Sequence, residues 1–243
     1  MLEHLRPKVV LFDFYGTLID FETDEYDETL HSAWEVIAHF LRYRGARTSA
    51  ELLRVRYFRY VEDALKETGN RHADVDVVRI FQRLMDEAGV MNGDGLAMTV
   101  AQLFRSRSIK RFELFHETRS VIEALAQKFV LGLVSDSQAP YLIPELQQVS
   151  LDRFFRTVVM SSTYGYRKPD PRLLLTAVEQ LGVSAEETIY VGDSWMRDVE
   201  GAHAAGIHPV WLCRGKRQVA PPHDFEVDVI RDLNELLRLH PPA

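Results

Sequence analysis

The sequence predicts an α/β protein, a doubly wound parallel sheet with an all-α segment inserted after its first strand. Two observations support this fold class. In the C-terminal half of the 243-residue chain, short apolar runs rich in β-branched and aromatic residues alternate with segments of helical period. A similar run, Val9–Phe12, lies near the N-terminus and is separated from the others by a long stretch of helical pattern.

Val9–Phe12 is expected to form a buried strand, because a continuous apolar run suits a strand that is covered on both faces. The run stops at Asp13, and Gly16 with Thr17 then indicates a turn. Open α/β sheets bind their ligands at the carboxyl ends of their strands. Asp13 is therefore a candidate site residue, although a carboxylate here can also simply cap a turn.

The stretch between residues 21 and 115 has the periodicity of helices. Apolar side chains recur at intervals of three and four residues in four successive stretches, at 30–41, 52–65, 77–85 and 96–105. No alternation of apolar and polar residues interrupts them. The whole segment is therefore expected to be helical.

The C-terminal half alternates between strand and helix patterns. The expected strands are 129–134, 157–160, a run ending at Asp193, 208–213 and an edge strand at 228–230. The expected helices are 118–127, 141–149, 171–181, a segment from 194 to 205, and 232–240. Such alternation implies right-handed crossovers and a parallel sheet. The expected domains are a core of residues 1–20 and 116–243 and a helical cap of residues 21–115, enclosing a cleft suited to a small molecule.

Composition limits the classes of function. Hydrophobic residues make up 46% of the chain and charged residues 27%, as in ordinary globular proteins. The net charge of −7 disfavours nucleic acid as a partner but allows a small anionic substrate. Cys213 is the only cysteine, and no apolar run is long enough for a membrane helix. We expect a cytoplasmic protein without membrane or nucleic-acid partners, and the sequence leaves its oligomeric state open.

Polar side chains stand at the ends of the expected strands or in the loops that follow them: Asp13, Ser135, Lys168 and Asp193. In a parallel sheet these ends share one edge. The motifs DFYGTL, VSDS, KPDP and VGDSWMRD, in this order, resemble the signature motifs of the haloacid dehalogenase superfamily of hydrolases. The resemblance covers the whole chain and implies a Rossmann-like core with a helical cap between the first and second motifs.

The resemblance also implies roles for individual residues. Asp13 would be the nucleophile and form a covalent aspartyl intermediate, with the positive charge of Lys168 beside it. The implied catalytic set is Asp13, Tyr15, Ser135 and Lys168, and the residues implied to bind substrate are Gly16, Thr17 and Ser135. Oxygen ligands for one Mg²⁺ would come from Asp13, the backbone carbonyl of Tyr15 and Asp193, and Asp198 would hold a metal-bound water. The alternative role of Asp198 is to orient Lys168.

Each of these residues alone has an ordinary structural explanation. Ser135 and Thr17 are common turn and cap residues, and Asp193 is able to cap the helix that follows it. Lys168 alone is explained equally well as a solvated loop residue. The joint occurrence of these residues, in this order along the chain, is what favours a site. Asp136 is left out of the catalytic set, because family members usually carry asparagine or a small polar residue there.

Tyr15 stands where phosphatases of this superfamily carry a second aspartate, the general acid and base. A phenol donates a proton but is a poor base at neutral pH. Tyrosine at this position also resembles the 2-haloacid dehalogenases, in which a halide leaves without a proton. Those enzymes work without metal, usually carry asparagine in place of Asp193, and use an arginine from the cap. Candidates for that arginine are Arg42, Arg44 and Arg56.

The fourth motif favours a Mg²⁺-dependent phosphatase of a small phosphorylated metabolite, because a carboxylate at residue 193 close to Asp13 requires a cation. The missing acid would come from the cap, where His31, Glu22 and Asp24 are candidates, or the leaving group would need no proton. The alternatives are a 2-haloacid dehalogenase and a degenerate member that binds a ligand or partner without turnover.

Overall fold

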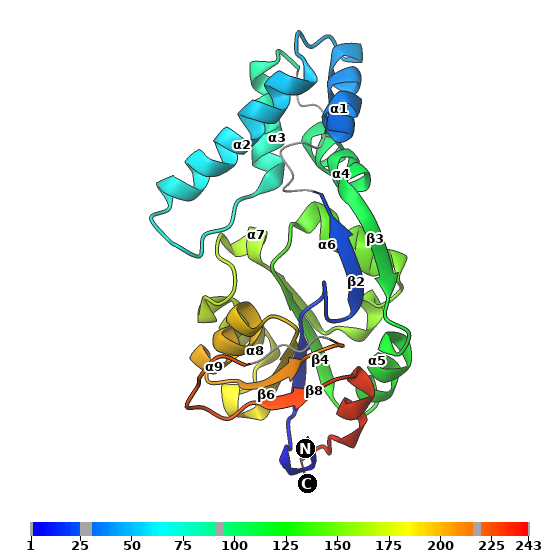
Figure 1. The fold of residues 1–243 in the computed structure, drawn as a ribbon, viewed down its shortest axis with the longest axis vertical. Coiled ribbons are helices and arrows are strands. Elements are labelled where there is room, and N and C mark those ends of the chain that lie inside the picture. The colour runs from blue at the N-terminus through cyan, green and yellow to red at the C-terminus, as the bar shows by residue number, and fades with distance from the viewer. Residues whose placement is uncertain (1, 25–30, 91–94, 216–219, 243) are drawn as a thin grey trace.

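The computed structural model describes residues 2–24, 31–90, 95–215 and 220–242. Its main element is a six-stranded parallel sheet in the order β5-β4-β1-β6-β7-β8 (Figure 1). The strands are β1 Val9–Phe12, β4 Val130–Ser135, β5 Thr157–Met160, β6 Thr188–Gly192, β7 His208–Leu212 and β8 Asp228–Ile230. The strand order reverses between β1 and β6, and open α/β sheets bind ligands at the carboxyl side of such a switch point. The predicted fold class is confirmed.

Strand β1 is central because both of its faces are apolar. Val10 and Phe12 contribute to the hydrophobic core on one face of the sheet, and Val9 and Leu11 to the core on the other. All four side chains are fully buried. This explains why the strand appears in the sequence as a continuous apolar run and not as an alternating one.

Helices cover both faces of the sheet. Helices α5 Thr118–Ala126 and α6 Ala139–Gln148 pack on one face, and α8 Pro171–Leu181 and α9 Glu200–Ala204 on the other (Figure 1). The predicted helix at 194–205 has two parts, because a π-helical turn, Trp195–Val199, precedes α9. The predicted helix at 232–240 is a 3₁₀-helix, and shorter than expected. The remaining short elements are α7 Ser161–Tyr164 and the 3₁₀-helices Leu2–His4, Asp152–Phe154, Ala185–Glu187 and Leu233–Arg238.

Four helices form a separate hydrophobic cluster, which we call the helical segment: α1 His31–Tyr43, α2 Ala50–Glu67, α3 Val77–Glu87 and α4 Leu96–Ser108. Aromatic rings from all four meet at its centre, with Trp34 4.9 Å from Phe104 and 5.1 Å from Tyr57 between ring centroids. The four helices predicted from the periodicity are thus present. Within the described ranges, no helix combines the length and apolar character needed to cross a bilayer.

The expectation that residues 21–115 contain no strand is wrong. Strands β2 Ile19–Thr23 and β3 Ile109–Leu114 pair in an antiparallel ribbon, with Phe21 opposite Phe112. Both strands are short and mostly part-buried, and the sequence IKRFEL of β3 has too few apolar residues to show a sustained alternation. The predicted domain boundaries therefore fall inside β2 and just after β3, so the chain enters and leaves the helical segment through paired strands.

Candidate active site

Side chains from three distant motifs meet beyond the carboxyl ends of β1 and β6. Lys168 Nζ donates hydrogen bonds to Asp13 Oδ1 at 2.7 Å, to Asp198 Oδ1 at 2.6 Å and to the Tyr190 hydroxyl at 2.8 Å. The lysine is buried together with both carboxylates. Burial opposes its charge, but the carboxylates of Asp13 and Asp198 outweigh this effect and hold the pKa of Lys168 well above its ordinary value. Lys168 is therefore a fixed cation beside Asp13.

The position of Asp13 at the end of a buried strand disfavours the ionised form of its carboxyl. Burial raises the pKa of Asp13 to about 7; the charge of Lys168 opposes this rise, and the nearby carboxylates of Asp198 and Asp193 add to it. Its second oxygen, Oδ2, is approached by Thr17 Oγ1 at 3.5 Å. Additional positive charge near Asp13 would favour the ionised form of this carboxyl.

The carboxylates of Asp13, Asp193 and Asp198 each offer an oxygen within 4.8 Å of the others. Asp193 Oδ1 is buried and has no hydrogen-bond partner among the described residues. Burial, followed by the charge of Asp198, raises the pKa of Asp193. Three converging carboxylate oxygens, one of them unpartnered, form the hard donor set that Mg²⁺ prefers. The residues present therefore fit a divalent cation.

Asp198 is the most constrained of the three carboxylates. Its Oδ1 accepts from Lys168, and its Oδ2 accepts from the backbone N–H of Ser194 at 2.8 Å. Since both oxygens are engaged, the geometry favours the second of the two predicted roles, the orientation of Lys168. Asp193, in contrast, has one oxygen, Oδ1, without a hydrogen-bond partner among the described residues.

Gly16 and Ser135 lie at the same edge. Gly16 has a φ of +85°, and a Cβ added there would lie 2.6 Å from Asp193 Oδ2, so the close approach of these two loops requires glycine. Ser135 is fully buried at the end of β4, and its Oγ has no hydrogen-bond partner in the described part of the chain. An orphaned hydroxyl at a strand end is a ready donor for a ligand oxygen.

Tyr15 points away from the carboxylates. Its hydroxyl donates to Glu145 Oε2 at 2.6 Å, and Glu145 forms a buried ion pair with Arg105 of α4, with Nε to Oε1 at 2.7 Å. The Tyr15 ring lies against Phe14 and Phe21, with centroids 4.9 and 4.5 Å away. The phenol is thus engaged in a network that joins the first motif to the helical segment.

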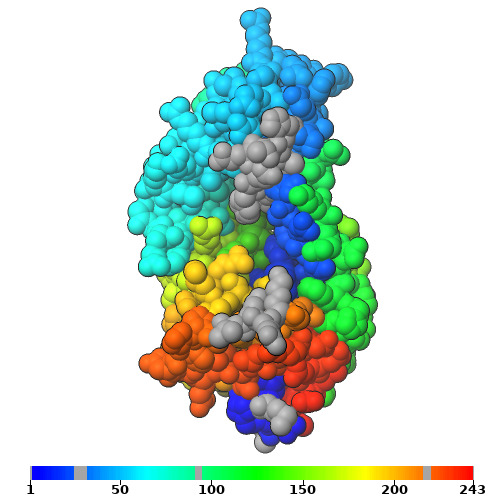
Figure 2. Space-filling view, in the orientation of Figure 1, coloured from blue at the N-terminus to red at the C-terminus, as the bar shows by residue number. Residues whose placement is uncertain are grey.

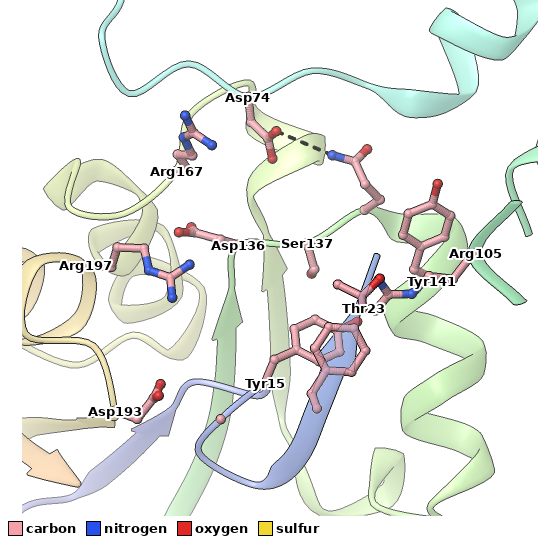
Figure 3. A pocket seen from close by; sticks show the side chains of 13 residues that line it. Tyr15, Thr23, Asp74, Arg105, Asp136, Ser137, Tyr141, Arg167, Asp193 and Arg197 are labelled. Atoms are coloured by element: carbon pink, nitrogen blue, oxygen red, sulfur yellow. Dashed lines mark hydrogen bonds between the residues drawn. The ribbon is translucent and has the colours of Figure 1, made fainter. Parts of the chain in front are cut away.

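A cavity of about 370 Å³ opens beside this site (Figure 3). Its lining includes Tyr15, Gly16 and Asp193 from the predicted motifs, and five further charged residues: Asp74, Arg105, Asp136, Arg167 and Arg197. Two of these, Asp74 and Arg105, come from residues 21–115. Backbone contacts at residues 72–74 and 165–167 bring the two parts of the chain together there, where cyan meets yellow-green in Figure 2.

Sequence reasoning missed these charged residues or set them aside. Asp136 accepts from the backbone N–H of Lys168 at 2.9 Å, and its other oxygen is buried without a partner in the described chain. Arg167 adjoins Lys168, and Arg197 lies inside the fourth motif, so motif proximity was the available signal for both. No such signal exists for Asp74 or Arg105.

The cap residues proposed from sequence lie elsewhere. Arg42, Arg44 and Arg56 do not line the cavity, and Arg56 pairs with Glu87 at 3.4 Å. Glu22 and Asp24 do not line it either; they pair with Arg111 and Lys110 of β3. The side chain of His31 lies outside the described residues.

Relatives with known names match nearly the whole length of this chain. The chain is 30% identical over 241 residues to a glyceraldehyde 3-phosphate phosphatase of Methanopyrus kandleri, covering 95% of this chain and 97% of that protein. It is 32% identical over 237 residues to a phosphoglycolate phosphatase of Pseudomonas putida, covering 95% and 79%.

Solved structures share the fold. A 2-haloacid dehalogenase from Pseudomonas syringae pv. Tomato has a TM-score of 0.70 at 21% identity, covering 95% of this chain and 96% of that one. An HAD phosphatase from Thermococcus onnurineus has a TM-score of 0.58 at 24% identity, covering 94% and 95%. The family model of haloacid dehalogenase-like hydrolases matches residues 10–212. The chain therefore belongs to the haloacid dehalogenase-like hydrolase family, and it is a hydrolase.

Proposed function

We propose that this hydrolase is a Mg²⁺-dependent phosphatase that acts on a small phosphorylated metabolite, with Asp13 as its nucleophile. Two sequence relatives that match 95% of this chain are named as phosphatases of small phosphorylated molecules. In this proposal residues 21–115 act as a cap, which is supported by the contribution of Asp74 and Arg105 to the cavity. A single cysteine fits a reducing location such as the cytoplasm.

The observation that carries the proposal is the unpartnered Oδ1 of Asp193 next to two other carboxylates. Without a cation, Asp193 would only raise the pKa of Asp13 and weaken it as a nucleophile. With Mg²⁺ bound by Asp13 and Asp193, the carboxylate of Asp193 would serve as a ligand of the ion, and the charge of the ion would offset the repulsion between the two carboxylates. The bound ion would supply positive charge that offsets the negative charge of a phosphoryl group.

The chain's own residues account for the chemistry of the first step. Asp13 Oδ2 attacks phosphorus while the bond from phosphorus to the leaving oxygen breaks, giving an aspartyl phosphate and an alkoxide or phenolate. Lys168 holds Oδ1 and keeps the nucleophile oriented. Ser135 and Thr17 donate to phosphoryl oxygens. Attack of water on phosphorus then releases phosphate and restores Asp13.

Tyr15 determines which leaving groups suit the enzyme. Its hydroxyl is bonded to Glu145, so it is not positioned to protonate a leaving group at Asp13. No other acid stands at this position of the first motif. We therefore expect a preference for phosphate esters whose leaving oxygen departs without a proton, such as aryl esters.

The same feature favours a second candidate, a 2-haloacid dehalogenase, because halide departure needs no acid. In that reaction Asp13 would displace halide from carbon without metal, and water would then hydrolyse the resulting ester. A third candidate is a protein that binds a phosphorylated ligand without turnover.

One experiment separates the three. Purified protein is assayed for phosphate release from p-nitrophenyl phosphate with Mg²⁺ and with EDTA, and for halide release from 2-chloropropionate. We expect phosphate release that EDTA abolishes and Mg²⁺ restores, and that Asp13→Asn and Asp193→Asn abolish while the surface control Asp152→Asn does not. Metal-independent halide release would establish the dehalogenase instead, and ligand-dependent thermal stabilisation without either activity would support the binding protein.

A further inference from the structure

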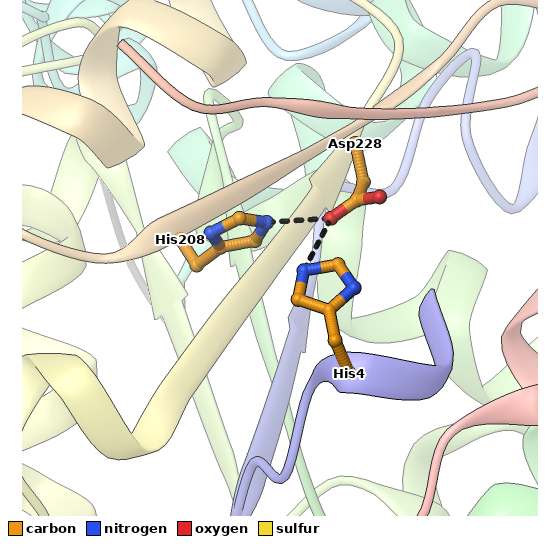
Figure 4. A group of neighbouring side chains, drawn as sticks. All are labelled: His4, His208 and Asp228. Atoms are coloured by element: carbon orange, nitrogen blue, oxygen red, sulfur yellow. Dashed lines mark hydrogen bonds and ion pairs between the residues drawn. The ribbon is translucent and has the colours of Figure 1, made fainter. Parts of the chain in front are cut away.

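Two histidines and an aspartate converge at the amino ends of β7 and β8, away from the active site (Figure 4). His208 is level with Ile189 on β6, four positions before Asp193. At about 3.3 Å per residue, His208 lies roughly 13 Å from Asp193 along the strand direction. The cluster is therefore separate from the carboxylates that surround Lys168.

The fold fixes the position of each member. Asp228 is paired with Val210 in the β7–β8 register. His208 lies two positions before Val210 and so projects from the same face, diagonal to Asp228. His4 belongs to the 3₁₀-helix Leu2–His4, which Leu2 anchors by burying its side chain in the core. All three side chains are thus held by packed backbone.

The spacing of the three side chains matches a metal site. Asp228 Oδ2 lies 2.9 Å from His208 Nε2 and 3.5 Å from His4 Nε2, and all three atoms lie within 4.8 Å of one another. A tetrahedral Zn²⁺ with bonds of 2.0–2.1 Å separates its ligand atoms by about 3.4 Å. Side-chain movements of a fraction of an ångström would open the space for an ion.

The donor types select the class of ion. Two imidazoles and one carboxylate suit Zn²⁺, Co²⁺ or Ni²⁺, whereas Mg²⁺ prefers oxygen alone. An ordinary ion pair would explain the contact of one histidine with Asp228. Here two imidazole nitrogens approach the same carboxylate oxygen, so the three side chains together form a set of three ligands. We propose that His4, His208 and Asp228 bind a divalent transition-metal ion of the zinc type, independently of the active site.

Such an ion would join the N-terminal turn to the last two strands of the sheet. Binding to the folded state alone stabilises it, in proportion to the logarithm of ion concentration over the dissociation constant. The site therefore has a readout that does not depend on catalysis.

The test is isothermal titration of untagged protein with ZnCl₂ in excess Mg²⁺, together with thermal unfolding. We expect one Zn²⁺ per chain and a raised melting temperature. His4→Gln, His208→Gln and Asp228→Asn should each weaken binding at least about tenfold, because each removes a ligand. His4 is 57% exposed, so its replacement tests the site without disturbing the fold.

Two controls define the outcome. His116→Gln alters the other histidine-containing acidic cluster of the described residues, and Asp193→Asn alters the active site; both should leave Zn²⁺ affinity unchanged. Absence of Zn²⁺ binding, or binding that His4→Gln and His208→Gln leave intact, would overturn the proposal. Loss of binding in either control would assign the ion to a different site and also overturn it.

Discussion

The carboxyl of Asp13 is kept partly protonated by its surroundings near neutral pH. Burial is the main cause, and the charges of Asp198 and Asp193 add to it. In the unfolded chain the same carboxyl ionises near its ordinary value of 3.8. The folded state therefore binds more protons than the unfolded state between about pH 4 and pH 7, and this group makes stability fall as pH rises through that window.

Asp13→Asn should consequently stabilise the protein in EDTA, and more at pH 8 than at pH 5. We expect a gain of the order of 2 kcal/mol at pH 8, because the variant lacks the buried, repelled carboxylate. Thermal unfolding of the wild type and variant at both pH values measures it. An equal effect at the two pH values would contradict the raised pKa.

Tyr15 allows a direct test of the missing acid. Tyr15→Asp should raise hydrolysis of an alkyl phosphate at least about tenfold relative to an aryl phosphate, since a carboxyl supplies the general acid that alkyl leaving groups need. Tyr15→Phe, which keeps the ring and removes the hydroxyl, should leave the ratio of the two rates unchanged. A change of this ratio in Tyr15→Phe would mean that the phenol itself acts as the acid.

Among the secondary-structure elements, α4 and α6 are joined by the buried ion pair of Arg105 and Glu145. The guanidinium also lies 4.5 Å from the centroid of the Phe21 ring on β2. Removal of one partner leaves a buried charge without compensation, which typically costs about 3–5 kcal/mol.

Arg105→Met should therefore lower the free energy of unfolding by about 3 kcal/mol, and Arg105→Met with Glu145→Met should recover part of the loss. Urea unfolding of the single and double variants measures the coupling. The exposed pair Arg59 and Asp63 of α2 is a matched control, for which Arg59→Met should cost less than about 1 kcal/mol. Equal losses in the two single arginine variants would show that the buried pair has no special role.

Elements with a strong period were predictable. Strand β5 and helix α8 occur at the expected residues, because an apolar run and a capped amphipathic pattern are local signals. Strands β2 and β3 were not predictable, since their pairing with each other and the packing of Phe21 and Phe112 against the core are contacts between distant parts of the chain. The π-helical turn at Trp195–Val199 likewise has no local signature; there the Ser194 N–H bonds Asp198 directly.

At the scale of the whole molecule, the net charge of −7 does not describe the cavity, whose lining carries three arginines beside three aspartates, Asp74, Asp136 and Asp193. The three arginines are Arg105, Arg167 and Arg197, and the charge of Arg167 opposes the rise that burial causes in the pKa of Asp74. A substrate with a second anionic group beyond its phosphate would find cations there.

Arg167→Met and Arg197→Met should each raise KM for a phosphorylated carboxylic acid about tenfold, as expected for loss of a charged hydrogen bond, with a smaller effect on p-nitrophenyl phosphate. Steady-state kinetics on both substrates measure it. The exposed Arg153, which is not part of the cavity lining, is the control for general charge effects. Equal KM changes for both substrates would place these arginines at the phosphoryl group instead.

The four motifs predicted which residues meet at one edge of the sheet, because these motifs mark the ends of parallel strands. The residues that line the cavity could not all be predicted from the sequence, because Asp74 and Arg105 reach it only through the packing of distant segments. Tyr15 marked a departure from the family pattern, but its partner Glu145 lies on a helix that no motif identifies.

The ribbon of β2 and β3 has a mechanical consequence. Only residues 14–18 separate Asp13 from β2, and the Gly16 N–H bonds the Ile19 carbonyl at 2.8 Å. The loop that carries Asp13 is therefore continuous with β2, and the partner of β2, strand β3, follows directly after α4. Any rotation of α4 would thus also displace the loop of Asp13, so the helical segment and the position of this carboxylate are mechanically coupled.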